Sequence, residues 1–293
     1  MKPRDFTILD VFAEEKYTGN QLAVVTDAAD LSTQEMLQIT REFHFSETTF
    51  ILAHSDTGNG YPVRIFTPAE EVPFAGHPTI GTAWAIRNLL NEKQPQHVTL
   101  DLKIGSITVS FSGDTDIGWM TTQSPSFSEP LAPDQLTHAL QLPVDAIDTR
   151  FPVQVVSTGL PALIVPVTTL DYLQQARVHT ERLSDLARQE SIGKCQLVFC
   201  PETLSPDNQL HVRVFCTLVD IPEDPATGSA NSCLAGYLVT HQYFDTQAID
   251  ISVEQGHEIQ RPSRLYLKAS VNDDTFSIQV GGKVCLVAKG QLL

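Results

Sequence analysis

Short runs in which apolar and polar residues alternate dominate this chain, and they predict a protein built mainly of antiparallel strands. Alternation places apolar side chains on one face of a strand while the other face meets water. In the first half we predict strands at residues 6–12, 48–52, 63–67, 97–102 and 106–111. In the second half we predict strands at residues 153–157, 163–167, 196–200, 212–217, 265–269, 275–280 and 284–288, and many of the strands in both halves alternate. Strands therefore outnumber helices in the predicted fold.

Helical spacing is found in a few segments. Ser32 and Glu35 form a capping box, which predicts a helix that begins near Ser32. Residues 80–90 and 229–239 are small or apolar on nearly every side over most of their length. A helix without a strong polar stripe is buried all round. We therefore expect an α+β protein with two barrel-like domains, each a curved, mostly antiparallel sheet rolled around one of these helices.

Two distant stretches carry the same pattern, about half a chain length apart. Residues 63–66 and 212–215 both follow the pattern Val-Arg-aliphatic-Phe, and each precedes a turn with a polar residue before proline. That polar residue is His77 in the first copy and Asp224 in the second. Each copy continues into a glycine followed by a hydroxyl residue, so Gly81 and Gly228 correspond in sequence. This repeat predicts two related domains rather than a solenoid.

The boundary between the domains is predicted in the Ser- and Pro-rich residues 122–130, where turn chemistry is concentrated. We predict domains at 1–127, with Glu47 and the Gly-His-Pro-Thr motif, and at 128–293, with the Glu-Asp-Pro-Ala-Thr-Gly-Ser motif. The last strand of the second domain could cross to the first. The two central helices are expected to point their N-termini at an interdomain cleft and to hold one small anion between them.

Residues 76–81 and 224–229 are the predicted anion sites, because a helix N-terminus gathers backbone N–H groups and partial positive charge. For Asp224 there is a plainer structural interpretation, in which it is an N-cap and Pro225 is the first helical residue. The repeated motif favours a site, since capping needs no counterpart elsewhere. His77 could satisfy a turn through its ring nitrogens, or could exchange a proton with a substrate near neutral pH.

Glu47 lies between Phe45 and Phe50 in a segment otherwise short of charge. A carboxylate near apolar side chains has a raised pKa, which suits a group that must both take and give a proton. The local sequence alone favours a different interpretation, in which Glu47 is a solvated glutamate at the start of a strand.

Composition limits the possible partners. The net charge is −16, from 19 basic and 35 acidic residues, and no basic patch stands out, which argues against nucleic acid. No apolar run is long enough to cross a membrane, and we predict a cytoplasmic protein. The five cysteines form no Cys-x-x-Cys pair, so reduced thiols are expected and a zinc site is not. No metal-ligand spacing and no nucleotide-binding glycine motif is found, so neither a metal nor a cofactor is predicted.

Four segments together are similar to the PhzF family of phenazine-biosynthesis-like isomerases. They are residues 10–25, 46–50, 73–79 and 223–231, which follow one another in the family's order across essentially the whole chain. The resemblance implies the diaminopimelate-epimerase-like fold, with the site between two similar domains. It also implies cofactor-free isomerisation of trans-2,3-dihydro-3-hydroxyanthranilate, a carboxylate-bearing substrate, and a homodimer. Gln260 departs from the pattern, since many relatives carry glycine before Arg-Pro-Ser.

By the same resemblance, Glu47 is the general acid and base, and His77 and Asp224 complete the catalytic set. Gly76, Thr227, Gly228 and Ser229 are the implied substrate-binding residues. Related epimerases and racemases use one cysteine from each half, but the first half of this chain has none, which excludes stereoinversion by two thiols. The leading hypothesis is proton transfer within a small carboxylate-bearing metabolite. The alternatives are an epimerase or racemase with Glu47 as one base and His77 or Asp224 as the other, and a binding protein that has lost catalysis.

Overall fold

The computed structural model describes residues 2–53, 56, 58–112, 115–219, 221–273 and 275–293. The chain forms two compact units. The first comprises Met1–Met120 together with Gly281–Leu293, and the second comprises Thr121–Val280. The last strand of the chain thus belongs to the first unit.

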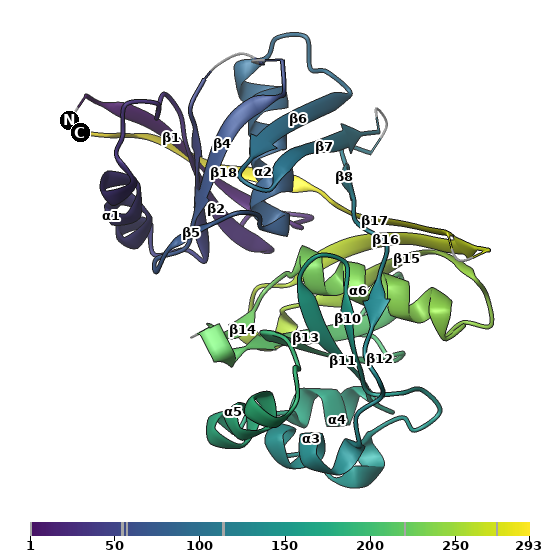
Figure 1. Cartoon of the computed structure of the whole chain (residues 1–293). Helices are drawn as coiled ribbons and strands as arrows, with labels where there is room; N and C mark the ends of the chain where they lie inside the picture. Colours follow the sequence, from purple (N-terminus) through teal and green to yellow (C-terminus); the bar gives the residue numbers. More distant parts are fainter. Residues whose placement is uncertain (1, 54–55, 57, 113–114, 220, 274) are drawn as a thin grey trace. The chain divides into compact units, whose positions relative to one another are not determined.

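The first unit is a curved sheet with one helix inside it and one outside (Figure 1). Its strands are β1 (Arg4–Val11), β2 (Asn20–Val25), β3 (Glu47–Ile51), β4 (Tyr61–Phe66), β5 (Glu71–Val72), β6 (His97–Leu102), β7 (Gly105–Phe111), β8 (Gly118–Thr121) and β18 (Val284–Leu292). β18 pairs with β1, and β1 with β2, in antiparallel fashion. β2 and β3 are parallel, and β4 then pairs with β3 on one edge and with both β5 and β6 on the other.

The central helix of the first unit is α2 (Gly76–Ala85), which continues as the π-helical turn η1 (Ile86–Leu90). Every residue of α2 is buried, as expected for a helix without a polar stripe. Gly81 lies where a Cβ atom would be 2.6 Å from a methyl group of Leu22 and 2.8 Å from one of Val11. Glycine at this position therefore lets the helix approach β1 and β2 closely.

The outer helix α1 (Thr33–Phe43) confirms the capping-box prediction. The hydroxyl of Ser32 accepts from the N–H of Glu35, and the carboxylate of Glu35 accepts from the N–H of Ser32 at 2.8 Å. Met36 and Ile39 are buried against a small apolar cluster that includes Phe50 and Phe66. The helix connects β2 to β3, and Glu47 is the first residue of β3.

The second unit repeats this architecture. Its strands are β9 (Ser126–Phe127), β10 (Gln154–Ser157), β11 (Pro161–Pro166), β12 (Cys195–Cys200), β13 (Leu210–Cys216), β14 (Ile221–Asp224), β15 (Ala248–Gln255), β16 (Ser263–Asn272) and β17 (Thr275–Gly282). β10 is antiparallel to β11, and β11 is parallel to β12. β13 pairs with β12 on one edge and with both β14 and β15 on the other. This is the order of β1 to β6 in the first unit, so the two-unit α+β fold class predicted from the sequence is confirmed.

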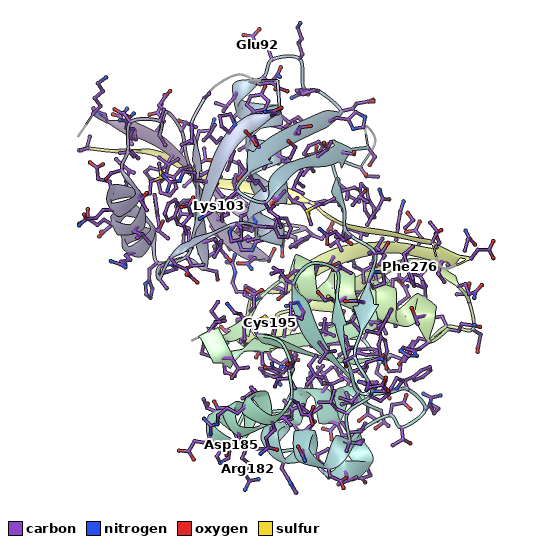
Figure 2. The ribbon with its side chains drawn as sticks, in the orientation of Figure 1. Glu92, Lys103, Arg182, Asp185, Cys195 and Phe276 are labelled. Carbon is purple, nitrogen blue, oxygen red and sulfur yellow. A yellow bond between two sulfur atoms is a disulfide. The ribbon has the colours of Figure 1, made fainter. Side chains whose placement is uncertain are left out.

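The central helix here is α6 (Gly228–Thr240), and the outer helices are α3 (Pro133–Leu140), α4 (Leu170–Gln175) and α5 (Thr180–Gln189). The outer helices cover a second core, in which Leu183 and Leu186 of α5 are buried. Figure 2 shows Arg182 and Asp185 pointing outward from α5, as the amphipathic pattern requires. Short 3₁₀ turns, η2 (Val144–Ala146), η3 (Thr217–Val219) and η4 (His257–Ile259), connect the elements.

The two central helices do not begin at equivalent points, although their motifs match in sequence. His77 is the second residue of α2, whereas Asp224 ends β14, four residues before α6 begins. The interpretation of Asp224 as an N-cap with Pro225 as the first helical residue is therefore wrong. Pairing of Asp224 with Val214 of β13 extends the strand through this residue and delays the helix.

The expectation of five reduced cysteines is wrong for one pair. Cys195 of β12 and Cys216 of β13 are joined by a disulfide, with Cα atoms 4.4 Å apart, while Cys200, Cys233 and Cys285 are free. Antiparallel pairing of β12 with β13 places the two residues opposite each other, at the spacing of a non-hydrogen-bonded pair. Sequence spacing could not reveal a pair that strand pairing creates.

Gln260, the departure from the family pattern, has a backbone φ of +58°, in the left-handed region. A residue with a Cβ atom is destabilised by roughly 1–2 kcal/mol in this region. Glycine avoids that strain, but it loses more backbone conformational entropy on folding, which costs about 0.5–1 kcal/mol. Gln260→Gly should therefore raise the free energy of unfolding by about 0.5–1 kcal/mol, measured by urea denaturation. Gln260→Ala, which keeps the Cβ atom, is the control, and equal stabilisation by alanine would contradict the explanation.

Candidate active site

In the first unit, Glu47 and His77 lie side by side. Glu47 is the first residue of β3, where it pairs with Leu22 of β2, and His77 is in the first turn of α2. Oε2 of Glu47 is 3.5 Å from Nε2 of His77. The side chains are 16% and 5% exposed, so Glu47 is not the fully solvated glutamate that local sequence favoured. Strand and helix thus bring together two of the predicted site residues that are 30 positions apart in sequence.

His77 is held in its neutral form. Burial lowers the pKa of His77 to about 3, against the opposing effect of a hydrogen bond with the backbone of Gln21. An interaction that raises a histidine pKa favours the protonated ring, so the ring donates to the Gln21 carbonyl. Nε2 has no hydrogen-bond partner among the described residues, which assigns that donation to Nδ1. The lone pair of Nε2 is therefore the group that faces Glu47.

This arrangement has a chemical consequence. A neutral histidine whose Nδ1 is protonated can only accept at Nε2, and a carboxylate can only accept as well. A single proton on Glu47 makes its carboxyl group a hydrogen-bond donor, and Nε2 of His77 can accept that hydrogen bond. The pair is thus suited to hold one proton on the carboxyl group, with a neutral imidazole supporting the acid form.

Gly76 opens the helix beside this pair. The N-cap of α2 is Ala75, whose side chain cannot bond the helix start. The hydroxyl of Thr79 donates to the Ala75 carbonyl at 2.7 Å, and the Thr79 N–H bonds the same oxygen at 3.2 Å. The first turn therefore begins without a side-chain acceptor for its N–H groups, which is the condition under which a helix start can bind an anion.

The predicted residues of the second motif gather in the second unit. Asp224 is 8% exposed, and its Oδ2 accepts from the hydroxyl of Thr227. Thr227 is the N-cap of α6 but makes no side-chain cap bond, and Gly228 and Ser229 form the first turn. The start of α6 is therefore surrounded by the four predicted residues of this motif, which are Asp224, Thr227, Gly228 and Ser229. Their closeness in sequence made this grouping predictable.

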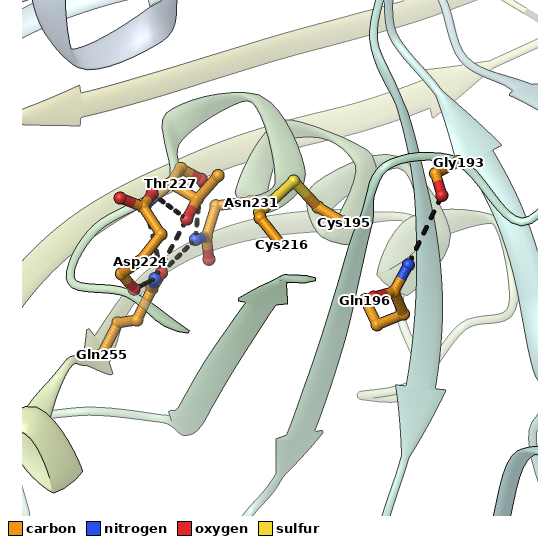
Figure 3. The surroundings of a disulfide bond; sticks show 8 residues. All are labelled: Gly193, Cys195, Gln196, Cys216, Asp224, Thr227, Asn231 and Gln255. Atoms are coloured by element: carbon orange, nitrogen blue, oxygen red, sulfur yellow. Dashed lines mark hydrogen bonds between the residues drawn. A yellow bond between two sulfur atoms is a disulfide. The ribbon is translucent and has the colours of Figure 1, made fainter. Parts of the chain in front are cut away.

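Sequence analysis missed the buried amides that surround this helix start. The side chain of Gln255, at the end of β15, bonds both Asp224 and Thr227, and Asn231 of α6 bonds Gln255 and Thr227 (Figure 3). Both amides are fully buried. The alternation of Ile249, Ile251 and Val253 was the available signal for β15, but nothing local linked its last residue to Asp224.

No group of three or more His, Cys, Asp or Glu side chains among the residues that the structure describes is placed to hold a metal ion. None of the helices described above is both long and apolar enough to cross a membrane.

Comparison with known proteins decides the family. A family model described as PhzC-PhzF, phenazine biosynthesis-like protein, matches residues 9–290. The chain belongs to this family. The resemblance of its four motifs to PhzF proteins is thereby confirmed.

Two curated relatives and one solved structure show the extent of the similarity. An uncharacterised isomerase of Mesorhizobium japonicum is 35% identical over 303 residues, covering 100% of this chain and 99% of that protein. Trans-2,3-dihydro-3-hydroxyanthranilate isomerase of Pseudomonas aeruginosa is 30% identical, with 98% of each covered. The crystal structure of a PhzF-family phenazine biosynthesis protein of Bacillus anthracis has a TM-score of 0.89 at 27% identity and covers 100% of both chains. The protein is therefore an isomerase.

Proposed function

We propose that this protein moves a proton between two carbons of a small carboxylate-bearing metabolite, with Glu47 as general base and then general acid and with no cofactor. The observation that carries the proposal is the contact of Glu47 with the neutral imidazole of His77. Glu47 removes a proton from one carbon, and the resulting acid donates a hydrogen bond to Nε2 of His77. It then returns the proton to another carbon on the same face, so the group ends as it began.

The helix starts supply the binding groups in this proposal. The carboxylate of the substrate binds backbone N–H groups at a helix start, where partial positive charge stabilises the anion that forms as the proton leaves. Gly76 and Gly228 allow close approach to the backbone, and Asp224, Thr227 and Ser229 contact polar groups of the substrate. That the protein is a cytoplasmic homodimer stays a prediction.

Inversion of a stereocentre by Glu47 and His77 together is disfavoured. Two bases that invert one carbon stand on opposite faces of it, and a carbon must fit between them. With Oε2 and Nε2 3.5 Å apart, the two groups are in direct contact and share one side of any bound carbon. The geometry therefore supports transfer along one face rather than epimerisation by this pair.

The reaction can be tested in heavy water. The probe is trans-2,3-dihydro-3-hydroxyanthranilate, the substrate in the name of the Pseudomonas aeruginosa relative. We expect NMR to show a product with a shifted double bond and with deuterium at the carbon that receives the proton, because the acid form of Glu47 exchanges with solvent. Inversion at one centre with unchanged double bonds would instead indicate an epimerase, and a compound left unaltered would reject this substrate.

A further inference from the structure

Asp224 and Pro225 form a sequence that normally starts a helix, yet α6 begins later. If Asp224 were the N-cap, its carbonyl would accept the first helical bond, from the N–H of Gly228, and its side chain would accept from an N–H two or three residues on. Instead Thr227 has extended backbone angles (φ −113°, ψ 90°), and the helix runs from Gly228. Within the segment, the hydroxyl of Thr227 donates to the Asp224 carboxylate, and contacts from outside add to this bond in holding residues 224–227 in this conformation.

The side-chain amide of Gln255 occupies two backbone groups that the earlier helix start would use. Its Nε2 donates to the carbonyl oxygen of Asp224 at 2.7 Å, and its Oε1 accepts from the N–H of Thr227 at 3.3 Å (Figure 3). Nε2 also donates to the hydroxyl oxygen of Thr227 at 3.1 Å, which orients the hydroxyl hydrogen toward Oδ2 of Asp224. Asn231 completes the set by donating to Oε1 of Gln255 at 2.9 Å.

The backbone next to Gln255 is pressed against the same segment. Gly256 has φ +78°, and a Cβ atom there would be 2.6 Å from the carbonyl oxygen of Pro225 and 2.4 Å from that of Arg261. On the opposite face of β15, Glu254 is anchored by His211 at 2.7 Å and by Asn208 at 2.7 Å. The end of β15 is therefore fixed on both faces, and the amide of Gln255 has little freedom to follow a moving loop.

The first unit has no amide side chain at the position that corresponds to Gln255. In the strand registers, Pro62 pairs with Asp101 and His211 pairs with Glu254. Pro62 and His211 each precede the motif arginine by two residues, so Leu102 is the counterpart of Gln255. Leucine offers no hydrogen bond, and there the helix begins at once, at Gly76.

We propose that Gln255 is a positioning residue, whose side-chain amide keeps residues 224–227 out of α6 and thereby sets the direction of the Asp224 carboxylate toward substrate. The structural part stands on the hydrogen bonds above, and the catalytic part rests on the proposed function, in which Asp224 contacts substrate. Gln255→Leu, which copies the first unit, should let Asp224 cap a longer helix. Gln255→Glu keeps the acceptor for Thr227 but loses the donor to Asp224.

The structural part is tested without substrate. Backbone ¹³C shifts of residues 225–227 in the labelled protein should move to helical values in Gln255→Leu, partly in Gln255→Glu, and not in Gln196→Leu. Gln196 is the matched control, because it is a fully buried glutamine of the same unit that bonds Gly193 and not this segment (Figure 3). Extended shifts that persist in Gln255→Leu would overturn the inference.

The catalytic part is tested by turnover of trans-2,3-dihydro-3-hydroxyanthranilate. We expect kcat/KM to fall about 10- to 100-fold in Gln255→Leu and less in Gln255→Glu, since displacing a group by about 1 Å can cost this much. Gln196→Leu should keep the wild-type value even if its melting temperature falls equally. Activity of Gln255→Leu within twofold of wild type, with Asp224→Asn impaired, would reject the positioning role. An inactive wild-type protein would instead reject the proposed substrate, and the ¹³C shifts would still decide whether Gln255 sets the helix start.

Discussion

Replacing Glu47 by glutamine should lower kcat about 10²- to 10⁴-fold, the range that a positioned general acid and base contributes. The amide has nearly the same shape as the carboxyl group but cannot take a proton from carbon. It can still donate to Nε2 of His77, so the local packing and the melting temperature should change little. The measurement is single-turnover formation of product from trans-2,3-dihydro-3-hydroxyanthranilate, together with deuterium uptake from heavy water.

Glu42→Gln is the matched control for this variant, because Glu42 lies exposed on α1 of the same unit. It should keep the wild-type kcat. Both variants remove one negative charge, so a loss of rate in Glu47→Gln alone is due to loss of the base. Glu47→Asp keeps the carboxyl group but moves it away from substrate and from His77, because the side chain is shorter. This variant should retain part of the rate. Undiminished turnover or deuterium uptake in Glu47→Gln would remove Glu47 from the mechanism.

Replacing Glu254 by alanine should destabilise the protein by about 3–5 kcal/mol, the usual cost of breaking a buried ion pair from one side. Glu254 is 1% exposed and accepts hydrogen bonds from the N–H groups of Leu204 (2.5 Å) and Ser205 (3.2 Å) as well as from His211 and Asn208. All these donors would lose their acceptor inside the unit. Urea denaturation measures the change.

The same pair predicts how stability depends on pH. Burial pushes the pKa of His211 down, but hydrogen bonds to Glu254 and Glu258 outweigh it and raise this pKa to about 8. Because the folded pKa lies above the unfolded value of 6.5, the protonated histidine stabilises the fold fully below pH 6.5, and this is lost as pH rises through 8. The loss is about 2 kcal/mol, at about 1.4 kcal/mol for each pH unit between the unfolded and folded pKa values of His211.

Glu254→Gln should reduce this dependence between pH 6.5 and 8, because the neutral amide no longer favours the charged ring. Asp207→Ala is the control, since Asp207 is 79% exposed and its contact with Arg264 is 4.0 Å long. It should change stability by less than about 1 kcal/mol. A pH slope that is the same in Glu254→Gln and in the wild type would show that His211 is not charged by this carboxylate.

Patterns of short range predicted much of the fold. The strand at residues 97–102 has the predicted bounds, since alternation is visible where one face of a sheet is solvated. The helix at Thr33–Phe43 was predicted by its own capping residues. The strand β15 was missed, although it alternates, and the repeat would have placed it as the counterpart of β6. The three outer helices of the second unit were also not predicted.

The candidate site was predictable only in part, because its residues act through contacts that sequence spacing does not encode. Glu47 and His77 were named from local chemistry and family resemblance, but their contact depends on how β3 and α2 pack. Gln255 is 31 residues from Asp224, and its effect is to oppose the local preference of Asp224 and Pro225 for a helix start. Patterns of local preference therefore could not predict the role of Gln255.

The strand β18 has a consequence for synthesis on the ribosome. It pairs along nearly its whole length with β1, which precedes the other strands in the sequence. Residues 121–280 form a contiguous unit, whereas the first unit lacks β18 until residues 281–293 have been made. The first unit is thus completed after the second has been synthesised, and until then the edge of β1 that pairs with β18 is an unpaired strand edge, which favours aggregation.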